Sequence, residues 1–420
     1  MRTCVLDARV EFFHQPFAKP LLISSGAITE ITEARAAVRV RVNGHEATGR
    51  GSIYLSDLWA WPEPSLTHDQ RDAVLRELCE RIASDLWEMC GGEEEHPLEL
   101  GMRLHHAVCD ESGGASVLAE AMCASPFDAA IHDAAGIALG MSAFDLYREP
   151  APIPSADALF AGKSACAAIA KMLRPPVREF DAWLIVSRGD SLEDAVQSWV
   201  RECGYHAFNV KILGRDNADD AARTAEVFRA VRPFGVAKPR LSVDSNEANP
   251  DAASVLDYLE RLRTIDAEAF DALEYLEQPT ARDIVANPND WRDVTRLKPV
   301  MLDEGLTSLE ILDEAVAQGW SGLALKTCKG HSFALVAAAW AHEHGLPVSL
   351  QDLTNPGLSA IHAALFAAHV PTVNGVELNS PQYTPAANAE WLPRLGGLLA
   401  PRDGFHRLPE KMPVGLGSVL

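Results

Sequence analysis

Five charged residues each end a short apolar run, and in chain order they read lysine, three carboxylates, lysine. They are Lys211 after "AFNV", Asp244 after "RLSV", Glu277 after "ALEYL", Asp303 after "VML" and Lys326 after "GLAL". The intervals between them are 33, 33, 26 and 23 residues, each about the length of one β/α unit. If the runs are successive parallel strands, the five side chains meet at one end of a sheet.

Three carboxylates that meet in this way repel one another, and a divalent cation among them would remove the repulsion. Oxygen ligands without His or Cys favour Mg²⁺, or Mn²⁺ as its substitute, over zinc. We therefore predict that Asp244, Glu277 and Asp303 bind a metal ion, whose open positions take the carboxylate of a small-molecule substrate. Taken singly, each acid could instead cap the following helix.

The two lysines flank the carboxylates in strand order, which suits acid–base chemistry at a carbon next to the substrate carboxylate. Removing a proton from such a carbon needs a base and stabilisation of the enediolate that forms. A metal ion would stabilise the enediolate and lower the pKa of a nearby ammonium, so that a free amine can act as the base. We predict that Lys211 and Lys326 are this acid/base pair, on opposite faces of the reacting carbon.

The composition is typical of a soluble, enzyme-sized globular protein. The 420-residue chain is 47% hydrophobic and 23% charged, and its net charge of −22 disfavours nucleic acid and anionic membranes as partners. Its eight cysteines are scattered without a CxxC pair, so we expect reduced thiols in a cytoplasmic protein. We expect neither a signal peptide nor a membrane-spanning segment.

Apolar runs alternate with helix-length amphipathic segments from about residue 183 onwards. The eight runs are "WLIVS", "AFNVK", "RLSVD", "ALEYLE", "VMLD", "GLALK", "PVSLQD" and "VNGVEL". Parallel strands are buried on both faces and need crossover helices, so this pattern predicts an α/β protein with a parallel β/α barrel. An open doubly wound sheet is the alternative, and the absence of GxGxxG after any run weakens it.

The chain divides into three expected parts. Residues 1–150 alternate first like strands and then like helices, which predicts an α+β domain. Residues 151–384 hold the barrel. Residues 385–420 are rich in Pro and Gly, and we expect this segment to pack back on the N-terminal domain.

The motifs around the five residues resemble those of the enolase superfamily, specifically its muconate-lactonizing subgroup within the mandelate racemase/muconate lactonizing enzyme family. The matching pieces are "NVKILG", "SVDSNEA", "YLEQP", "MLDEGLTS", "ALKTCKG" and, upstream, "AAIHDAAGIALGMSAFDLY". The resemblance implies a modified TIM (β/α)7β barrel with an N-terminal α+β capping domain. It also implies a Mg²⁺-dependent isomerase that removes an α-proton, leading to racemisation, epimerisation or cycloisomerisation, in a homo-oligomer that is a dimer or octamer.

The same resemblance indicates further site residues. Asn209 stands where the family often has the first lysine of a Lys-x-Lys pair that helps to hold the substrate carboxylate. Other candidate substrate contacts are Asp352, Thr354 and Asn355 after the seventh run and Tyr54 and Trp59 on loops of the capping domain. Candidate supporting residues around the metal are Asn246, Glu304 and Lys329. We interpret His132, which has no acidic partner at metal-binding spacing, as structural.

Three alternatives stay open on the sequence alone. Within the same chemistry, a dehydratase (lyase) would eliminate water from an acid sugar or a related hydroxy acid. A Schiff-base aldolase barrel would explain Lys326 but gives the three carboxylates no role. A barrel that binds a ligand without turning it over is the non-enzymatic reading.

Overall fold

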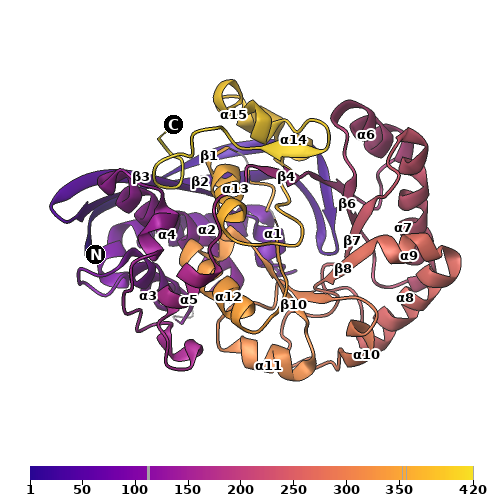
Figure 1. Cartoon of the computed structure of the whole chain (residues 1–420), viewed down its shortest axis with the longest axis horizontal. Helices are drawn as coiled ribbons and strands as arrows, with labels where there is room; N and C mark the ends of the chain where they lie inside the picture. The colour runs from indigo at the N-terminus through magenta and orange to yellow at the C-terminus, as the bar shows by residue number, and fades with distance from the viewer. Residues whose placement is uncertain (111–113, 352, 356, 420) are drawn as a thin grey trace.

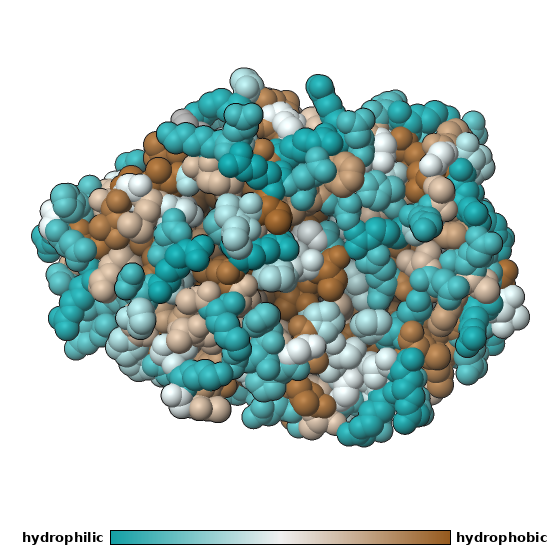
Figure 2. Space-filling model, in the orientation of Figure 1, coloured by the Kyte–Doolittle hydropathy of each residue, from teal (hydrophilic) through white to brown (hydrophobic). Residues whose placement is uncertain are grey.

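The computed structural model describes residues 1–110, 114–351, 353–355 and 357–419. Two sheets dominate it, an antiparallel sheet of three strands near the N-terminus and a parallel sheet of seven strands (Figure 1). On the face shown in Figure 2, hydrophilic residues predominate and hydrophobic ones are scattered between them. No helix in the described ranges is long and apolar enough to cross a membrane. All eight cysteines lie in these ranges, and none forms a disulfide.

The N-terminal part is the predicted sequence of strands followed by helices. Its elements are β1 (Thr3–Ile23), β2 (Gly26–Val42), β3 (His45–Tyr54), α1 (Asp57–Ala60), α2 (His68–Met89), α3 (Pro97–Cys109) and α4 (Val117–Leu139). Asn43 and Gly44 both have positive φ, as a two-residue hairpin turn requires. Gly51 of β3 lets α4 approach closely, because a Cβ there would lie 1.9 Å from the backbone oxygen of Pro126.

Seven of the eight predicted barrel strands form, and their order across the parallel sheet follows the chain. They are β5 (Trp183–Val186), β6 (Ala207–Lys211), β7 (Arg240–Asp244), β8 (Leu273–Glu277), β9 (Val300–Leu302), β10 (Gly322–Leu325) and β11 (Val348–Leu350). The helices between and after them lie on the outside of the strands in Figure 1. They are α6 (Ser198–Cys203), α7 (Asn217–Val231), α8 (Ala252–Ile265), α9 (Ala267–Ala272), α10 (Arg292–Thr295), α11 (Ile311–Gln318), α12 (His331–Glu343) and α13 (Gly357–His369).

The eighth predicted strand, within "VNGVEL", is not a regular strand in the structure. Two backbone hydrogen bonds still join this segment to β11, from Val373 N to Val348 O at 2.8 Å and from Glu377 N to Leu350 O at 3.0 Å, and the Asn374 side chain adds to them. The Asn374 amide accepts a hydrogen bond from Leu350 N at 2.9 Å and donates to Leu350 O at 3.0 Å. Its backbone oxygen accepts from the indole nitrogen of Trp183 at 2.8 Å. Residue 374 therefore connects β11 with β5, the two edge strands of the sheet.

Shorter elements complete the chain. In chain order, the elements between α4 and β5 are η1 (Ala143–Tyr147), η2 (Asp157–Phe160), α5 (Ala165–Met172) and β4 (Glu179–Asp181). The elements near the C-terminus are α14 (Ser380–Tyr383), α15 (Leu392–Leu399) and β12 (Phe405–Arg407). Strand β12 pairs with β4 in antiparallel orientation. The end of the chain returns to α4, where the buried Asp133 carboxylate accepts hydrogen bonds from Arg50 N, Leu416 N and the Ser418 hydroxyl.

Replacing Asp133 by Asn should destabilise the fold, because an amide oxygen cannot accept all three of these hydrogen bonds. We expect the free energy of unfolding to fall by about 1–3 kcal/mol, the cost of leaving a buried donor unsatisfied. Urea denaturation followed by circular dichroism measures this loss. Asp145→Asn, which changes an exposed carboxylate paired with Arg148, is the matched control. Equal stability of the two variants would show that Asp133 does not hold the C-terminal segment.

Candidate active site

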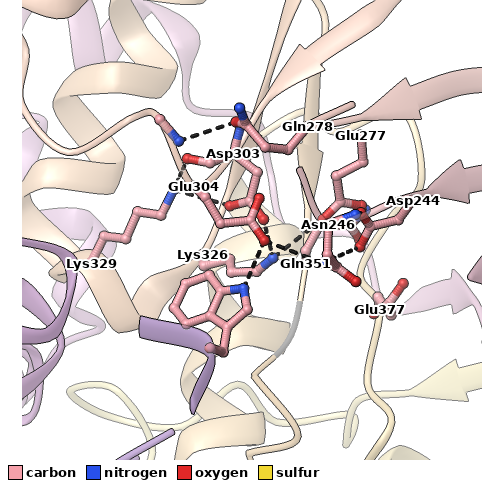
Figure 3. A network of polar contacts seen from close by, with 12 residues as sticks. Asp244, Asn246, Glu277, Gln278, Asp303, Glu304, Lys326, Lys329, Gln351 and Glu377 are labelled. Carbon is pink, nitrogen blue, oxygen red and sulfur yellow. Dashed lines mark hydrogen bonds and ion pairs between the residues drawn. The ribbon is translucent and has the colours of Figure 1, made fainter. Parts of the chain in front are cut away.

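The structure brings all five strand-end residues together at the C-terminal ends of β6 to β10. Lys211, Asp244 and Glu277 are direct register partners on three adjacent strands. Asp303 and Lys326 follow immediately after β9 and β10, and Figure 3 shows the carboxylates and Lys326 pointing toward one another. The strands are mostly buried, and each of the five charged side chains stands at the C-terminal end of its strand or directly after it.

Two lysines are bound into this group of carboxylates from different sides. The Lys211 ammonium lies 2.5 Å from Asp244 Oδ2. The Lys326 ammonium donates to Glu277 Oε1 at 3.2 Å and also to Asp303 Oδ2. The three carboxylates and Lys326 are at most 5% exposed, whereas 15% of the Lys211 side chain is exposed. Lys326 therefore sits between two carboxylates in the interior, and Lys211 is the more accessible of the two.

Burial and mutual charge shift the pKa values of these groups strongly. Burial raises the pKa of Glu277 well above its usual value, and Asp244 and Asp303 raise it further against the opposing effect of Lys326. Burial alone would also raise the pKa of Asp303, but Lys326 and Lys329 hold it below its usual value. Burial would lower the pKa of Lys326, yet the surrounding carboxylates keep it well above the usual value. The lysines are thus the charges that balance the acids in this arrangement.

Lys329 lies three residues after Lys326 and is fully buried. Its ammonium donates to the backbone oxygen of Asp303 at 2.5 Å and to Oδ1 at 3.0 Å. Lys326 and Lys329 therefore hold the two carboxylate oxygens of Asp303 separately, and they fix the orientation of this side chain.

Asn246, Glu304 and Trp59 form a second group beside Asp244. Asn246 donates to both carboxylate oxygens of Asp244, from its backbone at 2.7 Å and its amide at 2.8 Å. Glu304 Oε1 accepts from the Trp59 indole at 2.8 Å. Among the described residues, the other oxygen of Glu304 has no hydrogen-bond partner and is buried. Burial, with Asp303 and Asp244 adding to it, raises the pKa of Glu304 to about 8. The Trp59 ring also lies 5.1 Å from the Lys326 ammonium.

Three further residues of the site were not predicted from the sequence. Gln278 has a positive φ of 28°, and its side-chain oxygen accepts from Asp303 N at 2.9 Å and Gly305 N at 3.1 Å. Gln351 donates to Glu277 Oε2. Glu377 is buried and accepts from the Asn209 amide at 2.8 Å. The "EQP" motif was a signal for Gln278, but the other two lie far along the chain from their partners.

A pocket opens on this network, and some of the predicted substrate contacts line it. Among its described walls are Trp59, Lys211, Asn246, Lys326, Thr354 and Glu377. Tyr54 and Asn355 do not line it and instead contact each other, through a hydrogen bond from Tyr54 N to Asn355 Oδ1 of 3.2 Å. Asn209 reaches it only through Glu377, and Asp352 lies outside the described residues.

The carboxylates suit a divalent cation by their chemistry. They are three buried oxygen donors from adjacent strand ends, with a mutual repulsion that a cation would relieve. Within the part of the chain that the structure describes, however, no three His, Cys, Asp or Glu side chains are arranged to ligate one ion. The Lys326 ammonium occupies the place between Glu277 and Asp303.

Comparison with known protein families shows which family the chain belongs to. Residues 191–420, more than half of the chain, match a family model described as "Enolase C-terminal domain-like". The chain belongs to the enolase superfamily. The predicted resemblance to its mandelate racemase/muconate lactonizing enzyme family is thereby confirmed. A search among curated proteins gives no match for this superfamily member.

Solved structures with this fold extend over nearly the whole chain. One is an enolase from Bradyrhizobium complexed with magnesium and mandelic acid, at 18% identity and a TM-score of 0.66, covering 99% of this chain and 96% of the other. A muconate lactonizing enzyme from Pseudomonas fluorescens complexed with muconolactone gives the same values. A dipeptide epimerase from Enterococcus faecalis V583, complexed with Mg and L-Leu-L-Tyr, has 17% identity, covers 99% of each chain and has a TM-score of 0.67.

Replacing Lys329 by Met should destabilise this superfamily member strongly, because Asp303 would lose one of its two buried ammonium partners. We expect a loss of about 3–5 kcal/mol in the free energy of unfolding. Urea denaturation at pH 7 measures it. Lys171→Met removes an exposed ion pair with Glu343 and should cost less than about 1 kcal/mol. A loss at Lys329 as small as that at Lys171 would contradict the assigned pairing.

Proposed function

We propose that the protein removes the α-proton of a small carboxylate substrate with Mg²⁺ bound at Asp244, Glu277 and Asp303. The observation that carries the proposal is that Lys211 and Lys326 enter one group of buried carboxylates from different strands and both line the same pocket. In this proposal Lys211 and Lys326 are the acid/base pair. The racemase, epimerase and lactonizing names of the structural relatives support this chemistry.

The metal ion would bind the substrate carboxylate and stabilise the negative charge of the enediolate. With Glu277 and Asp303 as ligands of the ion, Lys326 would no longer be paired with them, and its amine would be available in the pocket that it lines. Lys211 would likewise be released from Asp244. Without a paired carboxylate the pKa of each lysine would be lower, which favours the free amine that a base needs. Lys329, which already holds Asp303, keeps that carboxylate oriented.

The product is proposed as the racemised, epimerised or cycloisomerised form of the substrate, with dehydration as the alternative. We further propose that residues 1–150 form a capping domain, residues 151–384 a (β/α)7β barrel, and residues 385–420 a segment packed on the capping domain. The barrel would be closed by the segment around Asn374 that bridges β11 and β5. Mn²⁺ as a substitute metal and a homo-oligomer, a dimer or octamer, are parts of the same proposal.

Incubation in D₂O with Mg²⁺ and a library of α-substituted carboxylates tests the reaction. We expect the wild-type protein to incorporate deuterium at the α-carbon of its substrate, as read by mass spectrometry, because the base exchanges its proton with solvent. Lys211→Ala and Lys326→Ala should each lose at least about 100-fold of rate, while Lys171→Ala, an exposed site, should not. Incorporation that survives both lysine substitutions would refute the assignment, and the masses of the products separate dehydration from isomerisation.

Asp244→Asn, Glu277→Gln and Asp303→Asn test the proposed ligands without any substrate. Each exchanges a charged oxygen donor for a neutral one, so we expect Mg²⁺ affinity to fall at least about tenfold in isothermal titration calorimetry. Asp133→Asn, a buried carboxylate on α4, should bind Mg²⁺ like the wild type. Unchanged affinity in all three ligand variants would place the ion elsewhere.

A further inference from the structure

One short turn carries both lysines that hold Asp303. Lys326 follows directly after β10, the 3-10 turn η5 (Thr327–Lys329) comes next, and α12 begins after Gly330. Both ammonium groups reach the Asp303 carboxylate. A shift of the turn, residues 326–332, would therefore move the proposed base and a support of a proposed metal ligand together.

This turn is fixed by a carboxylate from the N-terminal part of the chain. Gly330 offers no side chain to cap α12, so the first amide groups of the helix need another acceptor. Asp128 of α4 supplies it. Asp128 Oδ2 accepts from Ser332 N at 2.8 Å, and Oδ1 accepts from the Ser332 hydroxyl at 2.7 Å. Asp128 thus caps the N-terminus of α12 through Ser332, which lies 204 residues further along the chain.

Buried side chains on three elements hold Asp128 in place. His132 Nε2 lies 3.2 Å from Asp128 Oδ1 and 2.8 Å from Ser332 Oγ. Its other ring nitrogen lies 2.7 Å from the Tyr147 hydroxyl, which is also 3.0 Å from His331 Nε2. The network therefore connects α4, η1 and the start of α12.

The packing around Asp128 leaves little room for another arrangement. A Cβ on Gly101 of α3 would lie 2.0 Å from Asp128 Oδ1 and 2.1 Å from Ser332 Oγ. Gly330 has a φ of 108°, a conformation that favours glycine, and a Cβ there would lie 3.2 Å from Asp128 Oδ2. Two glycines thus make space for this one carboxylate.

We propose that Asp128 is a positioning residue for catalysis, which fixes the 326–332 turn and so sets the place of the Lys326 amine. Asp128 is hydrogen bonded to Ser332 and is not among the described residues that line the pocket, so it acts through Ser332 and the turn. The inference rests on the proposed function for its catalytic meaning. A displacement of about 1 Å at a reacting group can cost about 100-fold in rate. Asp128 can therefore control the rate even though it acts on Lys326 only through the turn.

Asp133 provides a matched control for the test. It lies on the same helix, is equally buried and accepts three hydrogen bonds, but its partners are Arg50, Leu416 and Ser418. Asp128→Asn and Asp133→Asn should therefore lower the melting temperature to a similar degree while they loosen different segments. Hydrogen–deuterium exchange of backbone amides, read by mass spectrometry, identifies those segments without any substrate.

In Asp128→Asn we expect amide exchange in residues 326–332 to rise at least about tenfold, and α-proton exchange of the substrate at saturating Mg²⁺ to fall about 10- to 100-fold. In Asp133→Asn we expect faster amide exchange near Arg50 and residues 413–418, unchanged amide exchange in residues 326–332, and a wild-type rate of α-proton exchange. Equal losses of α-proton exchange in both variants would overturn the proposal. A loosened turn with an unchanged rate would overturn it as well.

Ser332→Ala keeps the proposal testable if Asp128→Asn does not fold. It removes one of the two hydrogen bonds to Asp128 and keeps the backbone one, so a several-fold loss of α-proton exchange is expected, and a wild-type rate contradicts the proposal. Failure of the proposed function itself is seen separately, as a wild-type protein without α-proton exchange. In that case the amide exchange alone decides whether Asp128 fixes the turn.

Discussion

The pairing of buried lysines with buried carboxylates is the interaction on which the rest of this structure depends. Charges taken out of water cost several kcal/mol each unless they are paired and hydrogen bonded. Here Asp244, Glu277 and Asp303 would be unstable neighbours without the ammonium groups of Lys211 and Lys326 beside them. In the proposed function a divalent cation would neutralise the same carboxylates in place of the lysines, and the lysine amines would then be available for proton transfer.

Both main parts of the chain contribute to this arrangement. The parallel strands bring the five residues to the C-terminal end of the sheet, and residues of the N-terminal part contact the site as well. Trp59 of α1 donates to Glu304, and Ser24, in the turn between β1 and β2, donates to the backbone oxygen of Asn246 at 2.7 Å. Arg282, after β8, reaches back to the backbone oxygens of Trp59 and Ala60. The site is thus assembled only when the two parts are packed together.

The fold and the centre of the site could be predicted from the sequence because both follow from local patterns. An apolar run that ends in Asp244 or Lys326 marks a buried strand and its end, and the spacing between runs marks a β/α unit. Residues that act across long distances left no such signal. No sequence pattern around Asp128 indicates that it caps a helix beyond Lys326, and none around Asn374 indicates that its side chain bonds the backbone of β11.

The place of Glu377 in the site could not be predicted from the sequence either. It lies within the predicted eighth run, where alternation with apolar neighbours makes it look like an ordinary strand residue. Its importance appears only once the fold sets it against Asn209 and in the wall of the pocket. The polar contacts in the pocket wall are therefore set by tertiary packing, whereas the strand-end charges follow from the sequence pattern.

A crystal structure of the protein grown with Mg²⁺ tests the central claim most directly. We expect one Mg²⁺ ion bound by Asp244, Glu277 and Asp303. The Lys326 ammonium should be displaced from Asp303 into the pocket, and Lys329 should still be paired with Asp303. An ion bound elsewhere, with the pairs of Lys211 and Lys326 to these carboxylates intact, would contradict it.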